Sequence, residues 1–387
     1  MRDLTRCVKN PAVSTEGYAS LTVPTHRAST ITYPDGAAFA RRRERGLDGY
    51  TYGLSGTPTT RTLEAQIAGL NGGERAVVVP SGLAAISLVM VAALRPGDRV
   101  LIPDNVYPPV VDLCVNYLAP RGIAHAVYDP MIGEGIAAMI DATTKLVWIE
   151  TPGSGTMEVP DLPAITKVAK AKGALVGCDN TWATPLLFKP LAHGVDFASE
   201  ALTKYVGGHS DLLLGSITVA DLAHRAMLKD AIRPLGIGVS PDECALALRG
   251  IQTMGVRLAH AGRVAEAFAR RLAAASPVAR VLHPALDSCP GHAVWRRDFK
   301  GASGLFSVVL KPGLEAKLEV ALSGLKVFSI GASWGGTHSL LAPMAIDRKL
   351  SDAYAPGKGA VLRFSIGLED EEDLWAEIDT IMRKLAA

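Results

Sequence analysis

Short apolar segments alternate with helix-like segments from about residue 60 to residue 220 of this 387-residue chain. Helical spacing of apolar residues begins near Thr60, and a second amphipathic helix is expected at 162–173. Continuous apolar strands that alternate with helices are typical of a mostly parallel sheet covered on both faces. The sequence therefore predicts an α/β domain. Its predicted strands are RAVVV before Pro80, 98–104, 145–150, 174–180 and 216–220.

The character of the chain changes after about residue 246. Together the later elements predict a smaller α+β domain. They are a long helix at 254–275, strands at 304–312, 325–333 and 361–369, and a closing helix from Glu369. The chain is thus expected to divide into an N-terminal extended arm (1–55), a large α/β domain (56–246) and a C-terminal α+β domain (247–387).

Composition narrows the class of protein. The net charge of +2 and the absence of a basic stripe give no support for nucleic-acid binding. The apolar run at 86–94 is too short to cross a membrane, and the N-terminus does not resemble a secretion signal, so a cytoplasmic protein is expected. Five scattered cysteines without metal-ligand spacing indicate free thiols and no metal site.

Lys204 has unusual neighbours for a lysine. It lies between Thr203 and Tyr205, before the turn Gly-Gly-His-Ser, within an otherwise largely apolar segment (196–215). A poorly solvated ammonium group has a lowered pKa, and a neutral lysine amine can form a Schiff base with an aldehyde. Lys204 is therefore a candidate catalytic residue.

Three further positions are compatible with a phosphorylated pyridine aldehyde. The turn around Gly82 and Leu83 joins a strand to a helix and could bind a phosphate, although such turns are often only turns. Asp179 ends an apolar strand and could keep a pyridine nitrogen protonated, or it could be a turn residue. Tyr107 could stack on the ring, or it could be an ordinary loop tyrosine. Together with Lys204 these positions point to one cofactor.

The chain resembles the Cys/Met-metabolism family of pyridoxal-phosphate enzymes, which have fold-type I, from about residue 20 to the C-terminus. Within this family it is most similar to the bacterial cystathionine β-lyase branch, because Trp334 stands where γ-acting relatives usually have leucine. The motifs that carry the resemblance are YGLSGTPTTRTLE (52–64), PSGLAAI (80–86), DNTWATPL (179–186), LTKYVGGHSD (202–211), SWGG (333–336) and RFSIGLED (363–370).

The resemblance implies pyridoxal 5'-phosphate bound to Lys204, with Tyr107 stacked on the ring and Asp179 on the ring nitrogen. The phosphate would be held by the amides of Gly82 and Leu83 and by Thr203. A neighbouring subunit would supply Tyr52 from its N-terminal arm. A large domain with a seven-stranded, mostly parallel sheet and a homotetramer built as a dimer of dimers are also implied.

The resemblance further implies a substrate pocket for a sulfur amino acid. Arg363 would bind the α-carboxylate through two parallel hydrogen bonds, which lysine cannot reproduce. Ser333 and Trp334 would line the same pocket. The alternative for Arg363 is a charge at a strand edge, which its position between Leu362 and Phe364 makes the weaker reading.

The expected activity is α,β-elimination of L-cystathionine to homocysteine, pyruvate and ammonia, a step of methionine biosynthesis. A γ-lyase, a γ-synthase or a cysteine desulfhydrase of the same family remains an alternative, as does a non-catalytic binding protein. Three positions depart from the family pattern. Leu54 and Ala201 replace residues that contact phosphate in many relatives, and Ala332 replaces an aromatic residue and widens the substrate pocket.

Overall fold

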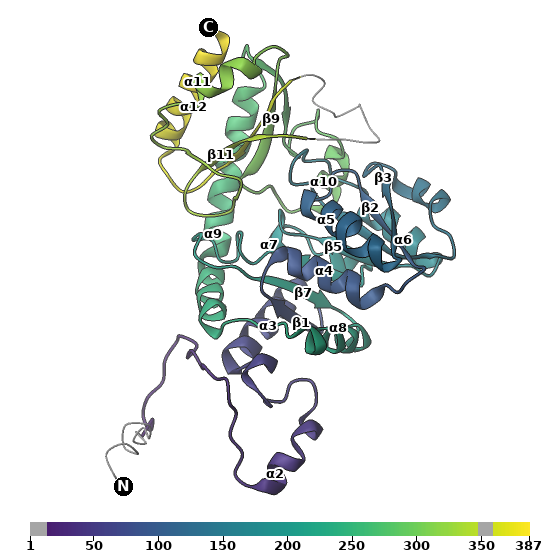
Figure 1. Cartoon of the computed structure of the whole chain (residues 1–387). Helices are drawn as coiled ribbons and strands as arrows, with labels where there is room; N and C mark the ends of the chain where they lie inside the picture. The colour runs from purple at the N-terminus through teal and green to yellow at the C-terminus, as the bar shows by residue number, and fades with distance from the viewer. Residues whose placement is uncertain (1–13, 347–358) are drawn as a thin grey trace.

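The computed structural model describes residues 14–346 and 359–387 and contains two sheets (Figure 1). The large sheet has seven strands in the order β1-β7-β6-β5-β4-β2-β3. Neighbouring strands from β3 to β6 are parallel, and β7 is antiparallel to both of its neighbours. The expected seven-stranded, mostly parallel sheet is thereby confirmed. Its strands are β1 (Arg75–Val79), β2 (Arg99–Pro103), β3 (Ala124–Tyr128), β4 (Thr144–Glu150), β5 (Leu175–Asp179), β6 (Phe197–Glu200) and β7 (Gly215–Val219).

Helices cover both faces of this sheet, which explains why its strands are almost wholly apolar. In β4, Leu146 and Trp148 pack beneath α4, whereas Val147 and Ile149 pack beneath α6. Helix α8 lies beside α4, and α3 covers β1 on the opposite face. The helices of this domain are α3 (Pro58–Asn71), α4 (Gly82–Ala93), α5 (Pro108–Asp112), α6 (Leu162–Ala171), α7 (Thr184–Leu187) and α8 (Leu222–Leu235).

A second, mainly antiparallel sheet forms the core of the C-terminal region, with strand order β10-β11-β12-β9-β8. The strand expected at 325–333 is wrong in extent, because only Ser329–Ile330 pairs. The elements here are β8 (Val278–Leu282), α10 (His292–Asp298), β9 (Leu305–Leu310), α11 (Leu318–Ala321), β10 (Ser329–Ile330), β11 (Leu340–Met344), β12 (Val361–Ser365) and α12 (Glu371–Ala386).

Helix α9 (Pro241–Leu272) connects the two regions (Figure 1) and begins well before the expected residue 254. It therefore crosses the expected boundary near residue 246. Gly250 interrupts its apolar pattern for a packing reason, since a Cβ there would lie 2.3 Å from the carbonyl oxygen of Val206 and 2.4 Å from that of Gly207. The helix thus packs directly against the segment that follows Lys204.

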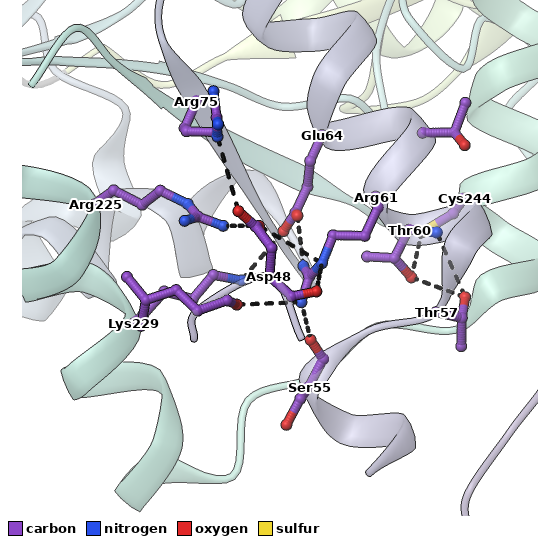
Figure 2. Close-up of polar contacts among 12 residues, drawn as sticks. Asp48, Ser55, Thr57, Thr60, Arg61, Glu64, Arg75, Arg225, Lys229 and Cys244 are labelled. Atoms are coloured by element: carbon purple, nitrogen blue, oxygen red, sulfur yellow. Dashed lines mark hydrogen bonds and ion pairs between the residues drawn. The ribbon is translucent and has the colours of Figure 1, made fainter. Parts of the chain in front are cut away.

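The described part of the N-terminal arm extends away from the body of the molecule and carries helix α2 (Gly36–Ala40) (Figure 1). Its base is attached to the large domain through Asp48, which pairs with Arg225 of α8 and lies 3.8 Å from Arg61 Nε and 3.9 Å from Arg75 Nε (Figure 2). Arg61 also donates to the carbonyl of Ser55. Ion pairs and hydrogen bonds therefore hold the base of the arm to the large domain.

Cys114, Cys178, Cys244 and Cys289 are buried free thiols, as expected, and Cys7 lies outside the described residues. Within residues 14–346 and 359–387, no helix is long and apolar enough to cross a membrane. No group of three or more potential metal-binding side chains occurs in the same ranges.

Candidate active site

A cavity of about 310 Å³, here called the reaction pocket, lies where the carboxyl ends of β4 and β5 meet the N-terminus of α4, the segment after β10 and Arg363 of β12. Eight of the ten predicted site residues line it. Ser333 contacts Lys204 from the rim, and Tyr52 lies elsewhere on the arm. The lining is Ser81, Gly82, Leu83, Ile86, Tyr107, Glu150, Pro152, Ser154, Asp179, Thr181, Trp182, Ala201, Thr203, Lys204, Leu213, Ala332, Trp334 and Arg363.

Lys204 lies in the loop between β6 and β7 and extends into the pocket. Its Nζ donates a hydrogen bond to Ser333 Oγ at 2.7 Å and lies 5.3 Å from the centre of the Trp334 ring. Burial, followed by the positive charge of Arg363, lowers the pKa of Lys204 to about 8, although the Asp179 carboxylate acts in the opposite direction. An appreciable fraction of this amine is therefore neutral near neutral pH.

Asp179 and Glu150 are opposed in register at the ends of β5 and β4. The side chain of Asp179 accepts from the N–H of Thr181 at 2.9 Å and from its hydroxyl at 2.5 Å. Burial raises the pKa of Asp179, whereas the Thr181 hydrogen bonds and the Lys204 charge oppose this shift. Thr181 also accepts from the N–H of Ala201, so it links Asp179 to the lysine loop.

Glu150 is a site residue that the sequence reasoning missed. One carboxylate oxygen accepts from the N–H of Tyr107 at 2.6 Å, and the other accepts from the N–H of Ser154 at 2.8 Å. Burial and the nearby Asp179 raise the pKa of Glu150 to about 7. The available signal was an acidic residue at the end of the apolar run KLVWIE, the same pattern that singled out Asp179.

The N-terminus of α4 forms the opposite wall. Ser81 caps the helix, so the free N–H groups of Gly82 and Leu83 precede its first intrahelical bonds. A Cβ at Gly82 would lie 2.6 Å from the Cβ of Ala201. Thr203 lines the pocket, but its hydroxyl donates to the carbonyl of Leu214 and accepts from the same residue's N–H. To donate to a phosphate, as predicted, the Thr203 hydroxyl would have to rotate away from the carbonyl of Leu214.

Arg363 reaches the pocket from β12 in the second sheet, with 7% of its surface exposed. Its guanidinium donates to the carbonyl of Ala332 at 2.5 Å and to that of Ser154 at 3.4 Å. The segment after Ala332 also requires a glycine. Gly335 has a φ of +82°, and it lies close to the backbone of Lys204. The segment after β10 thus packs directly against the loop that carries Lys204.

Tyr52 and Leu54 lie on the arm and not at the reaction pocket of their own chain. Tyr52 is 53% exposed. Leu54 lines a separate cavity of about 570 Å³ beneath the base of the arm. A contribution of Tyr52 to a neighbouring subunit therefore stays a prediction.

The reaction pocket fits pyridoxal phosphate in three respects. It offers a lysine amine of lowered pKa, a carboxylate at the end of a buried strand, and a helix N-terminus whose close contact with Ala201 leaves no room for a side chain at Gly82. Lys204 would hold the aldehyde carbon, Asp179 the ring nitrogen, and Gly82 and Leu83 the phosphate.

Comparison with known proteins agrees with this fit. The model of the family described as "Cys/Met metabolism PLP-dependent enzyme" matches residues 4–383. A Rhizobium johnstonii protein is 45% identical over 363 residues, covering 92% of this chain and 89% of that protein. Cystathionine beta-lyase MetC of Escherichia coli is 37% identical and covers 91% of each chain. A crystal structure of cystathionine gamma synthase from Xanthomonas oryzae pv. oryzae has a TM-score of 0.87 and 32% identity, covering 96% of this chain and 95% of that one.

Proposed function

The chain belongs to the Cys/Met-metabolism family of pyridoxal-phosphate-dependent enzymes, and on this premise we propose that it cleaves L-cystathionine by α,β-elimination. The products would be homocysteine, pyruvate and ammonia. The observation that carries the choice of β-elimination is Trp334, which stands where γ-acting relatives usually have leucine and packs beside the Lys204 amine. The names of the enterobacterial and other relatives support the same activity.

Three side chains would take part in the elimination: Arg363, Lys204 and Ser333. Bound pyridoxal phosphate supplies an electron sink for the negative charge that develops at the substrate α-carbon. Arg363 would bind the α-carboxylate and orient the Cα–H bond toward Lys204. The neutral Lys204 amine would take the α-proton, and Ser333, 2.7 Å away, would hold the amine in place. Lys204 would then return the proton to the departing sulfur.

Glu150 would support this arrangement without touching the substrate. Replacing it by glutamine leaves one amide oxygen and puts an NH₂ group against the second backbone N–H, which then has no acceptor. We expect Glu150→Gln to lower kcat/KM about tenfold, near the lower end of what a hydrogen bond to a charged group contributes. The exposed Glu134→Gln is the matched control and should leave kcat/KM unchanged. An unaffected Glu150→Gln enzyme would remove Glu150 from the positioning role.

The solved cystathionine gamma synthase leaves γ-chemistry as the second candidate. Incubation with L-cystathionine separates the two cleavage reactions, because β-cleavage releases pyruvate and homocysteine whereas γ-cleavage releases 2-oxobutyrate and cysteine. We expect pyruvate as the predominant keto acid, measured by chromatography. Predominant 2-oxobutyrate would overturn the β-lyase proposal, and pyruvate from cysteine but not from cystathionine would indicate a desulfhydrase.

We also propose a homotetramer built as a dimer of dimers and a cytoplasmic location. Supporting the assembly, the described arm extends away from the body (Figure 1) and has exposed apolar side chains, among them Leu21 and Tyr52. A subunit that receives Tyr52 from its neighbour would have an incomplete phosphate site as a monomer.

A further inference from the structure

The cavity beneath the base of the arm, here called the arm cavity, is larger than the reaction pocket, with a volume of about 570 Å³ against about 310 Å³. Among the described residues the two cavities have no lining residue in common. The arm forms one wall, and helices α3 and α8 form most of the other. The arm cavity is therefore separate from the site already assigned, and it has room for a molecule that fits the reaction pocket. The lining is Arg42, Arg43, Gly46, Leu47, Gly49, Thr51, Leu54, Ser55, Gly56, Thr60, Arg61, Glu64, Val78, Lys229, Ile232, Arg233, Ile237, Gly238 and Val239.

The lining of the arm cavity is strongly cationic. Five of its side chains are lysine or arginine, whereas Glu64 is its one carboxylate in the described part of the chain. Arg43 and Arg233 are exposed, and neither guanidinium makes an ion pair or a hydrogen bond to residues 14–346 and 359–387. Guanidinium groups bind phosphate through parallel hydrogen bonds, so the cavity suits a ligand that carries a phosphate group.

Lys229 of α8 brings an amine to the interior of the arm cavity. Its side chain is 14% exposed, and its Nζ donates to Glu64 Oε1 at 3.2 Å, while Arg61 donates to the other oxygen at 2.6 Å (Figure 2). Burial lowers the pKa of Lys229; the Glu64 carboxylate opposes this shift, and the charges of Arg61 and Arg225 add to it. A lowered pKa increases the neutral fraction of a lysine amine, which is the form that reacts with an aldehyde.

The arm cavity also has an apolar wall. Leu54 lies beside Ile232, Ile237 and Val239 there. It packs closely on the loop after α8, since a Cβ at Gly238 would lie 2.5 Å from Leu54 Cδ1. A flat ring can bury its surface against such a wall. The cavity thus combines cations for a phosphate, apolar surface for a ring and a buried amine for an aldehyde, which are groups that the reaction pocket offers to the cofactor.

We propose that the arm cavity is a second binding site for pyridoxal phosphate, in which Arg43 and Arg233 bind the phosphate and Lys229 reacts reversibly with the aldehyde. The ligand would contact the arm and α8 together, and so would hold the arm against the body. The inference does not depend on which reaction the enzyme catalyses, because the cofactor alone is the ligand.

The covalent step balances without an oxidant or a reductant. Glu64 would take one proton from the Lys229 ammonium group, and the freed amine would attack the aldehyde carbon. A carbon–nitrogen double bond then forms as the carbonyl oxygen leaves as water, with one proton from the nitrogen and one from Glu64. The positive charge stays on the nitrogen beside the Glu64 carboxylate, so the pair of opposite charges is preserved.

The test labels the wild-type holoenzyme with increasing concentrations of pyridoxal phosphate, reduces it with borohydride and identifies the labelled lysines by mass spectrometry of peptides. We expect label on Lys204 throughout, and saturable label on Lys229 at concentrations that leave the exposed Lys189 unlabelled. Pyridoxal, which has the aldehyde but no phosphate, should need a concentration at least about tenfold higher to label Lys229, since a hydrogen bond to a charged group contributes about 1.5–3 kcal/mol.

Two variants test the proposed contacts separately. The exposed pair Arg43→Gln and Arg233→Gln, combined in one protein, should raise the concentration for half-maximal labelling of Lys229 about 10- to 100-fold and leave labelling of Lys204 unchanged. Arg296→Gln, on the exposed face of α10, is the control and should alter neither. Lys229→Arg keeps a cation beside Glu64 but has no primary amine, so the reduced protein should hold one equivalent of cofactor per chain in place of two.

Three results would overturn the second site. They are labelling of Lys229 at no lower concentration than Lys189, equal labelling of Lys229 by pyridoxal and pyridoxal phosphate, and unchanged labelling of Lys229 when both arginines are replaced. Absence of label on Lys204 would instead count against the reaction pocket as the cofactor site, so the two failures are distinguishable.

Discussion

Replacing Lys204 by alanine is expected to abolish turnover and to remove the visible absorption band of the bound cofactor. The amine at this position has a pKa lowered to about 8 and is the group that both holds the cofactor and moves the α-proton. Loss of proton transfer alone costs on the order of 10²- to 10⁴-fold in rate, and loss of covalent attachment adds to it. Initial rates of pyruvate release and an absorption spectrum measure the two effects separately.

The matched control is Lys189→Ala, because Lys189 is exposed and does not line the reaction pocket. It should retain both the band and the rate of the wild-type enzyme. A Lys204→Ala protein that kept wild-type turnover, or kept the visible band after extensive dialysis, would show that another group binds the cofactor.

Replacing Arg363 by lysine is expected to weaken substrate binding while leaving the cofactor spectrum nearly intact. The guanidinium is buried and donates to the carbonyls of Ala332 and Ser154. Because a guanidinium group has five N–H donors in one plane, it can make these bonds and still bind a carboxylate. A lysine ammonium keeps the charge but cannot make the two parallel bonds. We expect KM to rise about 10- to 100-fold, since a hydrogen bond between charged groups contributes about 1.5–3 kcal/mol.

Steady-state kinetics should show this effect mainly in KM, with kcat falling less. Arg296→Lys, at an exposed position on α10, is the control and should alter neither constant. Loss of cofactor from Arg363→Lys would mean that the residue supports the cofactor and not the substrate carboxylate.

Five of the seven strands of the large sheet could be predicted from the residues, because each is a short apolar run in the sequence: β1, β2, β4, β5 and β7. In β4 and β5 an apolar run ends in a single carboxylate, and burial on both faces follows from the run itself. The start of helix α9 was predicted too late, because Gly250 interrupts the apolar pattern of the helix. The glycine is needed there for close packing against the loop after Lys204. Four strands were not predicted at all, since a polar residue or a proline interrupts the apolar run in each: β3, β6, β8 and β11.

The same division holds for the site. The residues around Lys204, the turn at Gly82, Asp179 at a strand end and Tyr107 pointed to a phosphorylated pyridine aldehyde, because each group's chemistry depends on its own local segment. The family resemblance then identified it as pyridoxal phosphate. The clamp that Glu150 makes on Tyr107 and Ser154 was not predictable in this way, since it depends on which loops fold over β4.

By itself, the sequence determined the parallel α/β domain and the candidate lysine, because strand burial and the chemistry of Lys204 are set within short segments. Its family motifs determined the cofactor. Only the tertiary structure decided that Ser333, 129 residues away, accepts from the lysine amine and that the carbonyl of Ala332 accepts from Arg363. Those contacts arise where the segment after β10 and strand β12 of the second sheet meet the carboxyl ends of the first. No spacing along the chain encodes how two separately formed sheets pack against each other.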